Sequence, residues 1–358
     1  MGGQNKKEGL FRGTPVWVLT MVLLLAALFV SLLTAVTIGS TDIPIEDVYH
    51  VILYKIFGAG DPSYGEGNLF RAVWYLRLPR LVLAAGIGMG LAVCGVVMQA
   101  VVKNPLADPY VLGISSGASL GATLAILAGA GAVFGGNSIG FMAFLGAFGV
   151  SLLVVTLANM GGRANSVKLL LAGMAASSVC SAFSNFIVYT AHDREGIQTV
   201  TYWMMGSMAG ATWEQDGAVL AVALMGLLFF WTQHRNLNLM LLGDESAITL
   251  GTDLHRWRQL YLLVSAAMVG FAVYAAGMIG FVGLVVPHVV RMLFGTDHKK
   301  LIPLCALSGA VFLVWADVAC RVLIEGTELP IGILTSMIGA PVFIYLMSRK
   351  KYGFGGGD

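Results

Sequence analysis

Charged residues are scarce in this chain, and their scarcity excludes most kinds of soluble protein. Asp, Glu, Lys and Arg make up 11% of its 358 residues, whereas soluble domains average about 25%. Apolar residues make up 57%. This composition leaves too few polar groups to cover a water-facing globule, so the lipid bilayer must be the main solvent. The net charge of +2 is too small to suggest nucleic acid as a partner.

Cysteine and nucleotide-binding motifs are also lacking. The four cysteines lie in apolar stretches without CxxC spacing, so we expect small buried hydrophobic residues rather than disulfides or metal ligands. No GxxxxGK[ST] segment is present, so the chain cannot by itself hold a nucleotide in the P-loop manner. A membrane-embedded enzyme is therefore disfavoured. We expect no catalytic residue, no metal site and no cofactor bound by this chain.

Long apolar intervals, by contrast, are plentiful. About 20 apolar residues are needed to cross a hydrocarbon core of about 30 Å, and the chain offers ten such segments. Gly135 to Ser138 is a turn signal that divides the long uncharged interval 109–162 into two of them. The eighth segment is short, and Pro287 within it predicts a kink or a break. The ten are 15–38, 81–102, two within 109–162, 169–191, 217–232, 259–279, 281–294, 301–323 and 332–347.

An even number of spans places both termini on one side, and the distribution of positive charge predicts which side. With the N-terminus inside, 15 of the 21 Lys and Arg residues fall in cytoplasmic loops. The first apolar run is too long for a typical signal peptide, which favours an anchor. We therefore expect a multi-pass membrane protein with both termini in the cytoplasm. Its parts would be a cytoplasmic tail (1–14), a ten-helix domain (15–348) with a cytoplasmic loop (233–258), and a second tail (349–358).

Two arginines sit where positive charge is doubly unfavourable. Arg77 and Arg80, in the segment LRLPR, precede the second span on its outer side. There they face the positive end of a helix dipole and also depart from the loop bias. Such a position requires an anion, which could be a lipid phosphate or an acidic partner protein. Arg321 is a third outer cation, although Asp317, four residues earlier, could pair with it.

The cytoplasmic loop 233–258 contains a short helix-like segment bracketed by Gly243 and Gly251. A helix of this length cannot span the bilayer and has no core of its own to pack against. It is either a solvated connector or a knob that inserts into a cytoplasmic partner. A different segment, 43–57, has apolar residues on one helical face, so we expect it to lie along the membrane surface.

Seven motifs together resemble the permease subunits of ATP-binding-cassette importers for iron-siderophore complexes, haem and cobalamin, the FecCD type. Their order and spacing follow the family through almost everything after residue 75. The motifs are LRLPR (76–80), QAVVKNPLADPYVLGISSGAS (99–119), KLLLAG (168–173), YWMMGSMAGATW (202–213), LGDESAITLG (242–251), GFVGLVVPHVVR (280–291) and ELPIGILTSMIGAPVFIYL (328–346).

The resemblance implies the all-α type II ABC importer permease architecture, with about ten transmembrane helices in the bacterial inner membrane. It implies a homodimer or a pair with a similar permease, two cytoplasmic ATPase subunits that bind ATP and Mg²⁺, and an extracytoplasmic substrate-binding protein. The cargo would be a metal chelate, with iron-siderophore favoured and haem or cobalamin as alternatives. A short outer helix is expected at 199–213, and the fifth and tenth spans would line the pathway.

The resemblance also implies roles for individual residues. Residues matching the binding-protein docking positions are Arg77, Arg80 and Arg321. Residues matching the ATPase coupling helix are Gly243, Asp244, Glu245, Ala247, Leu250 and Gly251. Residues matching the cytoplasmic gate are Asn104, Pro105, Leu106, Asn165 and Ser166.

A self-sufficient secondary transporter is the chief alternative, since composition alone does not exclude it. Ion-coupled carriers usually hold ionisable residues within the membrane. Asp317 is the only acidic residue that the sequence places well inside a span. Coupling to an ion gradient is therefore poorly supported. The two alternatives differ in whether transport requires an ATPase.

Overall fold

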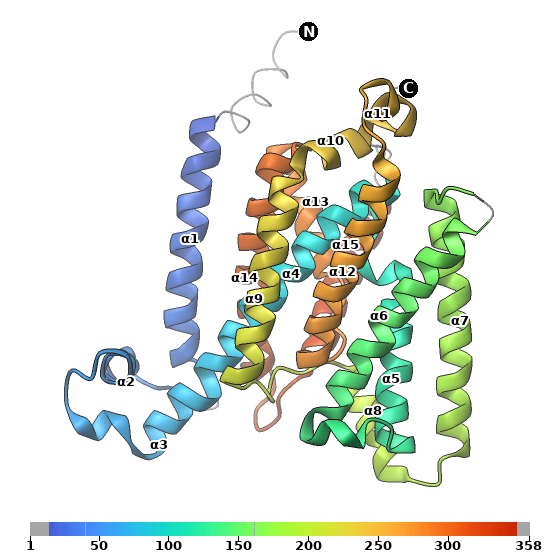
Figure 1. Cartoon of the computed structure of the whole chain (residues 1–358). Helices are drawn as coiled ribbons and strands as arrows, with labels where there is room; N and C mark the ends of the chain where they lie inside the picture. Colours follow the sequence, from blue (N-terminus) through green and yellow to red (C-terminus); the bar gives the residue numbers. More distant parts are fainter. Residues whose placement is uncertain (1–13, 40, 161, 349–358) are drawn as a thin grey trace.

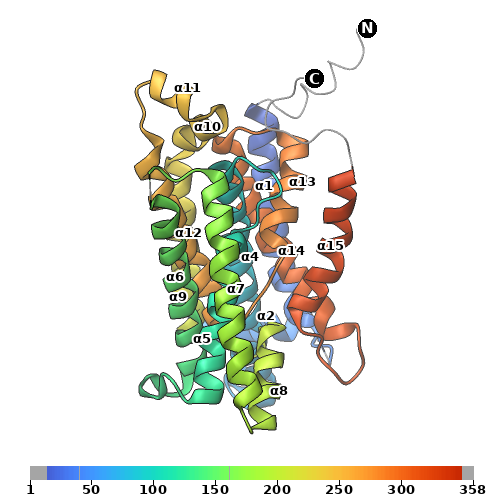
Figure 2. The same ribbon diagram turned by 90° about the vertical axis from the view of Figure 1, so that its right-hand side faces the viewer.

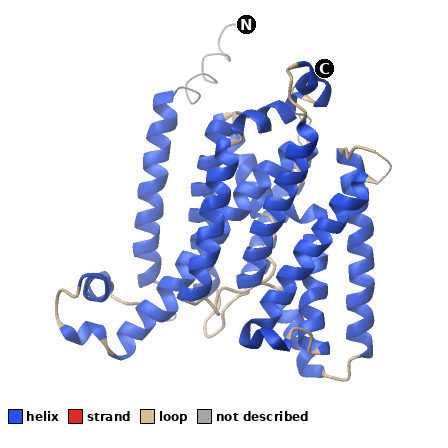
Figure 3. Cartoon of the chain, viewed as in Figure 1, coloured by secondary structure: helices blue, strands red, loops and turns tan. Residues whose placement is uncertain are grey.

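The computed structural model describes residues 14–39, 41–160 and 162–348, and the regular secondary structure within these ranges is helical (Figure 3). The predicted tails lie outside the described residues, apart from Thr14, where the first helix begins. Seven helices are long and apolar enough to cross a membrane, and three shorter apolar helices accompany them. The all-α fold with about ten membrane helices is thus confirmed.

The seven long helices match the long apolar intervals of the sequence. They are α1 (Thr14–Thr37), α4 (Leu78–Val102), α6 (Ser138–Asn159), α7 (Ser166–Thr190), α9 (Trp213–Thr232), α12 (Leu254–Ala276) and α14 (His298–Val322). The three shorter ones are α5 (Ile114–Ala128), α13 (Val282–Phe294) and α15 (Ile331–Ser348).

Shorter elements connect these helices. They are α2 (Ile45–Phe57), η1 (Pro62–Gly65), α3 (Gly67–Phe70), the π-helix η2 (Arg71–Arg77), η3 (Pro109–Leu112), η4 (Ala132–Asn137), α8 (Arg194–Met204), α10 (His234–Leu242) and α11 (Asp244–Thr249). The predicted surface segment is α2, which buries Val48 and Val51 and exposes Ile45, Tyr49 and Ile56. An exposed apolar face on a short helix suits a position at the membrane surface.

The bundle has two distinct ends (Figures 1 and 2). The first residues of α1 and the last residues of α15 lie at the same end as α10 and α11, hereafter the α11 end. The helices α2, α3 and α8 lie at the opposite end, hereafter the α2 end. This arrangement agrees with an even number of spans. The central helix α4 packs against α9, α12, α13 and α14.

Glycines allow α4 to approach its neighbours closely. A Cβ on Gly309 of α14 would lie 2.6 Å from the Ala92 Cβ of α4, and a Cβ on Gly283 of α13 would lie 2.9 Å from the Leu91 carbonyl oxygen. Both distances are too short for any larger residue. In a membrane, where apolar burial between helices gives little driving force, such close backbone contact is a main source of packing energy.

The helix α13 runs through Pro287 without interruption, so the break expected there is wrong in position. Proline leaves the carbonyl of Gly283, four residues earlier, without its helical donor. The amide Nε2 of the fully buried Gln99 donates to that carbonyl at 3.4 Å. The chain instead breaks before α13, at residues 277–281, where Gly277 and Phe281 have φ values of 68° and 67°.

Two further expectations need correction. The outer helix expected at 199–213 is α8, which begins earlier because the Asp193 carboxylate caps it by accepting from Gly196 N at 3.0 Å. It ends just before Gly206, whose φ of 72° stops the helix. The predicted start of α9 is also wrong: the helix begins at Trp213, four residues before the predicted 217, and so includes the fully buried Asp216 in its first turn.

Candidate functional site

Two adjoining cavities lie where the membrane helices are interrupted. The first, of about 440 Å³, is lined partly by Asp108 and Tyr110, from the irregular segment between α4 and α5, and by Gly280 and Phe281, from the break before α13. The second, of about 460 Å³, shares Gly280 with the first. Irregular backbone at membrane depth is tolerated where it lines a cavity or is buried in protein. The cavities therefore account for the irregular backbone at these helix interruptions.

Methionine dominates the lining of the second cavity. Met204, Met205, Met278 and Met337 line it, together with Gly332, Ile333 and Ser336. Met278 also lines the first cavity, where its Sδ accepts from the Ser115 hydroxyl at 2.9 Å. Small, apolar and mildly polar lining residues were expected, but the methionines themselves were not identified from the sequence. The adjacent pair Met204-Met205 within the motif YWMMGSMAGATW was the available signal.

The two cavities draw on residues far apart in the chain. Backbone hydrogen bonds hold the contributing segments together: Ser207 N donates to Ala276 O at 2.8 Å, and Gly332 N donates to Met205 O at 3.0 Å. The end of α8, the break before α13 and the start of α15 thus form one unit. The α15 helix, matching the predicted tenth span, contributes to the cavity lining, and no described residue of α7, the predicted fifth span, lines either cavity. That these two spans line the transport pathway stays a prediction.

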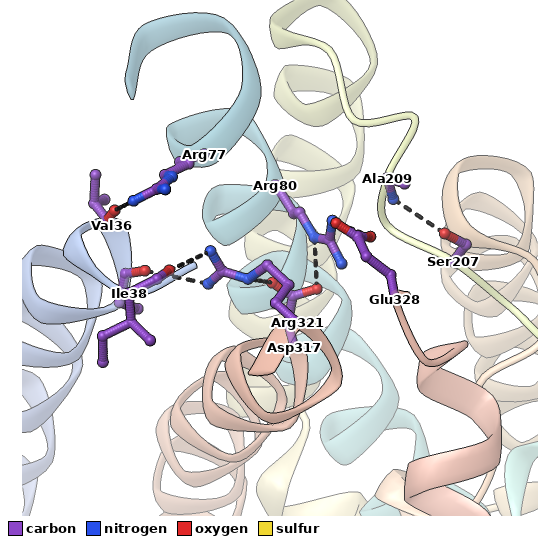
Figure 4. A network of polar contacts seen from close by, with 10 residues as sticks. Val36, Ile38, Arg77, Arg80, Ser207, Ala209, Asp317, Arg321 and Glu328 are labelled. Atoms are coloured by element: carbon purple, nitrogen blue, oxygen red, sulfur yellow. Dashed lines mark hydrogen bonds and ion pairs between the residues drawn. The ribbon is translucent and has the colours of Figure 1, made fainter. Parts of the chain in front are cut away.

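Arg80 lies in a buried ionic network at the α2 end (Figure 4). Its Nε is 2.8 Å from Asp317 Oδ1 on α14, and its Nη1 is 2.7 Å from Glu328 Oε2 in the loop before α15. The side chains of Arg80 and Asp317 are 11% and 1% exposed, whereas Glu328 is 52% exposed. The anion that this position requires is therefore supplied by the chain itself.

Arg321 connects the end of α1 to this network, and Arg77 binds the end of α1 separately (Figure 4). Arg321 Nε is 3.2 Å from Asp317 Oδ2, as its spacing of four residues suggested, and its Nη1 donates to Ile38 O at 2.8 Å. Arg77 Nη1 donates to Val36 O at 2.7 Å, and Arg77 Nη2 donates to Thr41 O. The three predicted docking arginines thus converge on one region, with their guanidinium groups engaged inside the chain. Their role toward a binding protein stays a prediction.

The segment bracketed by Gly243 and Gly251 is helical, as expected, and forms α11 at the α11 end (Figure 1). Ala247 is fully buried, whereas Ile248 and Leu250 are 56% and 64% exposed. The side chains of Asp244 and Glu245 lie outside the described part of the structure. The role of this segment toward a cytoplasmic partner stays a prediction.

The predicted gate residues lie at two helix ends. Asn104, Pro105 and Leu106 follow α4, and the Asn104 Oδ1 accepts from Leu106 N at 2.9 Å to close a tight turn. Asn165 caps α7 by accepting from Lys168 N at 2.8 Å, and Ser166 is the first residue of that helix. Both segments therefore have well-defined local structure. Their gating role stays a prediction.

One acidic residue near these segments has a clearly shifted pKa. Asp253 caps α12, where its Oδ1 accepts from His255 N at 3.0 Å. This hydrogen bond to the ionised carboxylate lowers the pKa of Asp253, and the nearby Arg163 guanidinium lowers it further. Asp253 is therefore negatively charged throughout the physiological range.

Comparison with known proteins assigns the chain to a family. The model of the FecCD transport family matches residues 23–349. The vitamin B12 import system permease proteins BtuC of Salmonella paratyphi A and Salmonella typhi are each 41% identical to the chain over 291 residues, which is 81% of this chain and 87% of theirs.

A solved structure agrees with this assignment. An inward-facing structure assigned to the metal-chelate type of ABC transporter superposes with a TM-score of 0.78 at 30% sequence identity, covering 91% of this chain and 98% of that chain. The chain belongs to the FecCD transport family.

Proposed function

We propose that this chain is the membrane-spanning permease of an importer that moves a metal chelate into the bacterial cytoplasm by alternating access. The observation that carries the proposal is the pair of adjoining cavities at the helix interruptions, in a chain of the FecCD transport family. The cavities combine apolar walls with a few polar groups. Such a lining would hold a large chelate weakly enough to release it.

Two chelate classes remain candidates, and a specific observation favours each. The likeness to a metal-chelate type transporter fits the predicted iron-siderophore cargo. The 41% identity to vitamin B12 permeases favours cobalamin. Methionine side chains suit either, because thioethers are polarizable and adapt to irregular surfaces.

The proposed partners follow from the two ends of the bundle. Two ATPase subunits, which would bind ATP and Mg²⁺, would receive α11, since Ile248 and Leu250 offer an exposed apolar surface there. On this proposal the α11 end would face the cytoplasm, which is the side where the sequence predicts an excess of Lys and Arg. A second permease copy would complete the pathway.

An extracytoplasmic binding protein would dock at the α2 end. Arg77, Arg80 and Arg321 are buried, so acidic groups of that protein would have to compete with anions and carbonyls of this chain. Glu328 is the most exposed of these internal partners. The residues 104–106 and 165–166 would close the cytoplasmic mouth between transport cycles.

Reconstitution of the complete importer tests the proposal. The permease is placed in proteoliposomes with its ATPases, and the binding protein is added with radiolabelled cobalamin or an iron-siderophore. We expect uptake of one of the two chelates only when ATP is supplied to the ATPase side. Vesicles that contain the permease alone serve as the control and should accumulate neither.

A different result would identify a different class of transporter. Chelate accumulation by the permease alone, driven by an ion gradient, would establish a secondary carrier and overturn the proposal. Uptake of cobalamin but not iron-siderophore, or the reverse, would decide the cargo.

A further inference from the structure

The end of α11 and the start of α12 form one connected segment. Gly251 N donates to Ile248 O at 2.9 Å, and Thr252 N donates to Ala247 O at 2.9 Å. Gly251 has a φ of 81°, which closes the turn after the helix. Asp253 follows directly and caps α12. A displacement of α11 is therefore passed to Asp253 through backbone hydrogen bonds.

This segment contacts the loop between α6 and α7 through a hydrogen bond and an ion pair. Arg258, in the second turn of α12 and 3% exposed, donates through Nη1 to Ala164 O at 3.3 Å. Arg163 Nη2 lies 3.4 Å from Asp253 Oδ2. A small cavity of about 30 Å³ lies between the two sides, lined by Arg163, Ala164, Ile248, Asp253, Leu254, His255 and Arg258.

The loop that Arg258 contacts, at Ala164, leads directly into α7. Ala164 is buried and precedes Asn165, the residue that caps α7. In the apolar window of α7, 22% of residues are buried in this chain, compared with 94% in the window that includes α4 and 6% in the window of α1. Much of the surface of α7 therefore makes no contact within this chain.

The other predicted gate segment also lies close to α11. Lys103 ends α4 with a φ of 55°, directly before Asn104. A Cβ on Gly243, the residue before α11, would lie 3.8 Å from Lys103 Nζ. Each end of α11 is thus near one of the two predicted gate segments.

We infer that Arg258 and Asp253 are positioning residues that transmit movement of α11 to the first turn of α7 by holding residues 163–164. The inference rests on the proposed function and extends it, since neither residue was assigned a role by the sequence motifs. The buried Arg258 contact holds the Ala164 carbonyl. The exposed Asp253–Arg163 pair holds the loop between α6 and α7 in a fixed position relative to α11.

The first experiment uses the complete importer in proteoliposomes and measures chelate uptake and ATP hydrolysis together. We expect Arg258→Met to lower uptake per ATP hydrolysed by about fivefold or more while hydrolysis continues. Arg256→Met is the matched control, because Arg256 is exposed on the same helix, and its ratio should equal that of the wild type. Arg258→Lys should recover part of the loss, because an ammonium can donate to the same carbonyl. A wild-type ratio in Arg258→Met would overturn the inference.

A second pair of variants covers the case in which Arg258→Met does not fold. Arg163→Gln and Asp253→Ser alter exposed side chains, and serine still caps α12. Both should lower the ratio, and the double variant should be no worse than the stronger single variant, since both break one contact. Unchanged ratios, or fully additive losses, would contradict the link.

A distance measurement separates this inference from the proposed function, because it does not require transport. The native cysteines are buried, so spin labels can be attached to cysteines introduced at Leu171 of α7 and Trp315 of α14, both exposed. When the attached ATPases bind nucleotide, we expect the distance to change in the wild type and not in Arg258→Met. No change in the wild type, or the same change in both, would overturn the inference even if uptake is normal. Failure of wild-type uptake alone would instead count against the proposed function.

Discussion

The two ends of the bundle differ in how they depart from the usual arrangement of residues. At the α2 end, charged side chains lie inside the protein: Asp317 is 1% exposed and Arg321 is 6% exposed. At the α11 end, large apolar side chains lie outside: Ile248 and Leu250 are 56% and 64% exposed. Buried charge and exposed apolar surface are the informative exceptions in a folded chain. The first ties the helices α1, α4 and α14 together, and the second is the surface that we propose for contact with the ATPase subunits.

The largest expected effect comes from removing the central carboxylate of the α2 end. Asp317→Ala would leave the buried guanidinium groups of Arg80 and Arg321 without their shared anion. Breaking such a buried pair costs about 3–5 kcal/mol of stability. Thermal unfolding in detergent or nanodiscs would measure the loss. Glu325→Ala, which removes an exposed carboxylate from the following loop, is the control and should change stability little. Equal effects of the two variants would show that burial of the network is unimportant.

A smaller effect, on binding instead of stability, is expected at the α11 end. Leu250→Asp would place a charge within the proposed ATPase contact and leave the bundle intact. Loss of a central interface residue typically costs about 2 kcal/mol, which is about 30-fold in affinity. Co-purification or titration with the ATPase subunits would measure it. Val133→Asp makes the same kind of change at a 95% exposed residue of η4 and should bind normally. Normal binding by Leu250→Asp would place the ATPase contact elsewhere.

The smallest effect is expected from the exposed member of the ionic network. Glu328→Gln removes one of the two carboxylates that pair with Arg80 and leaves the other, Asp317, in place. Because Glu328 is 52% exposed, its ion pair is largely screened by water and should contribute only about 0.2–1 kcal/mol. Unfolding at low and high salt would measure this contribution. A loss as large as that of Asp317→Ala, or one independent of salt, would show that Glu328 belongs to the buried part of the network.

The membrane helices were predictable because the signal is local. An uncharged apolar interval can be recognised from the sequence alone, and among the described residues seven such intervals form helices long enough to cross the bilayer core and three form shorter apolar helices. The helix α11 was predictable for a similar reason, since two glycines bracket it. The predicted helix boundaries were less accurate where residues at the helix ends set them. The start of α8 depends on Asp193, and α9 begins four residues before the start predicted from hydropathy, so it includes Asp216.

The sequence by itself determined how many times the chain crosses the membrane, which family it resembles and where its unusual charges lie. Only the tertiary structure decided what those charges contact, since Arg80 and Glu328 are 248 positions apart. It also decided that methionines from α8, the break before α13 and α15 line one cavity, and that Arg258 holds Ala164. The physical reason is that apolar length and capping act between near neighbours in the chain. Ionic partners, cavity walls and links between loops depend on which helices pack together.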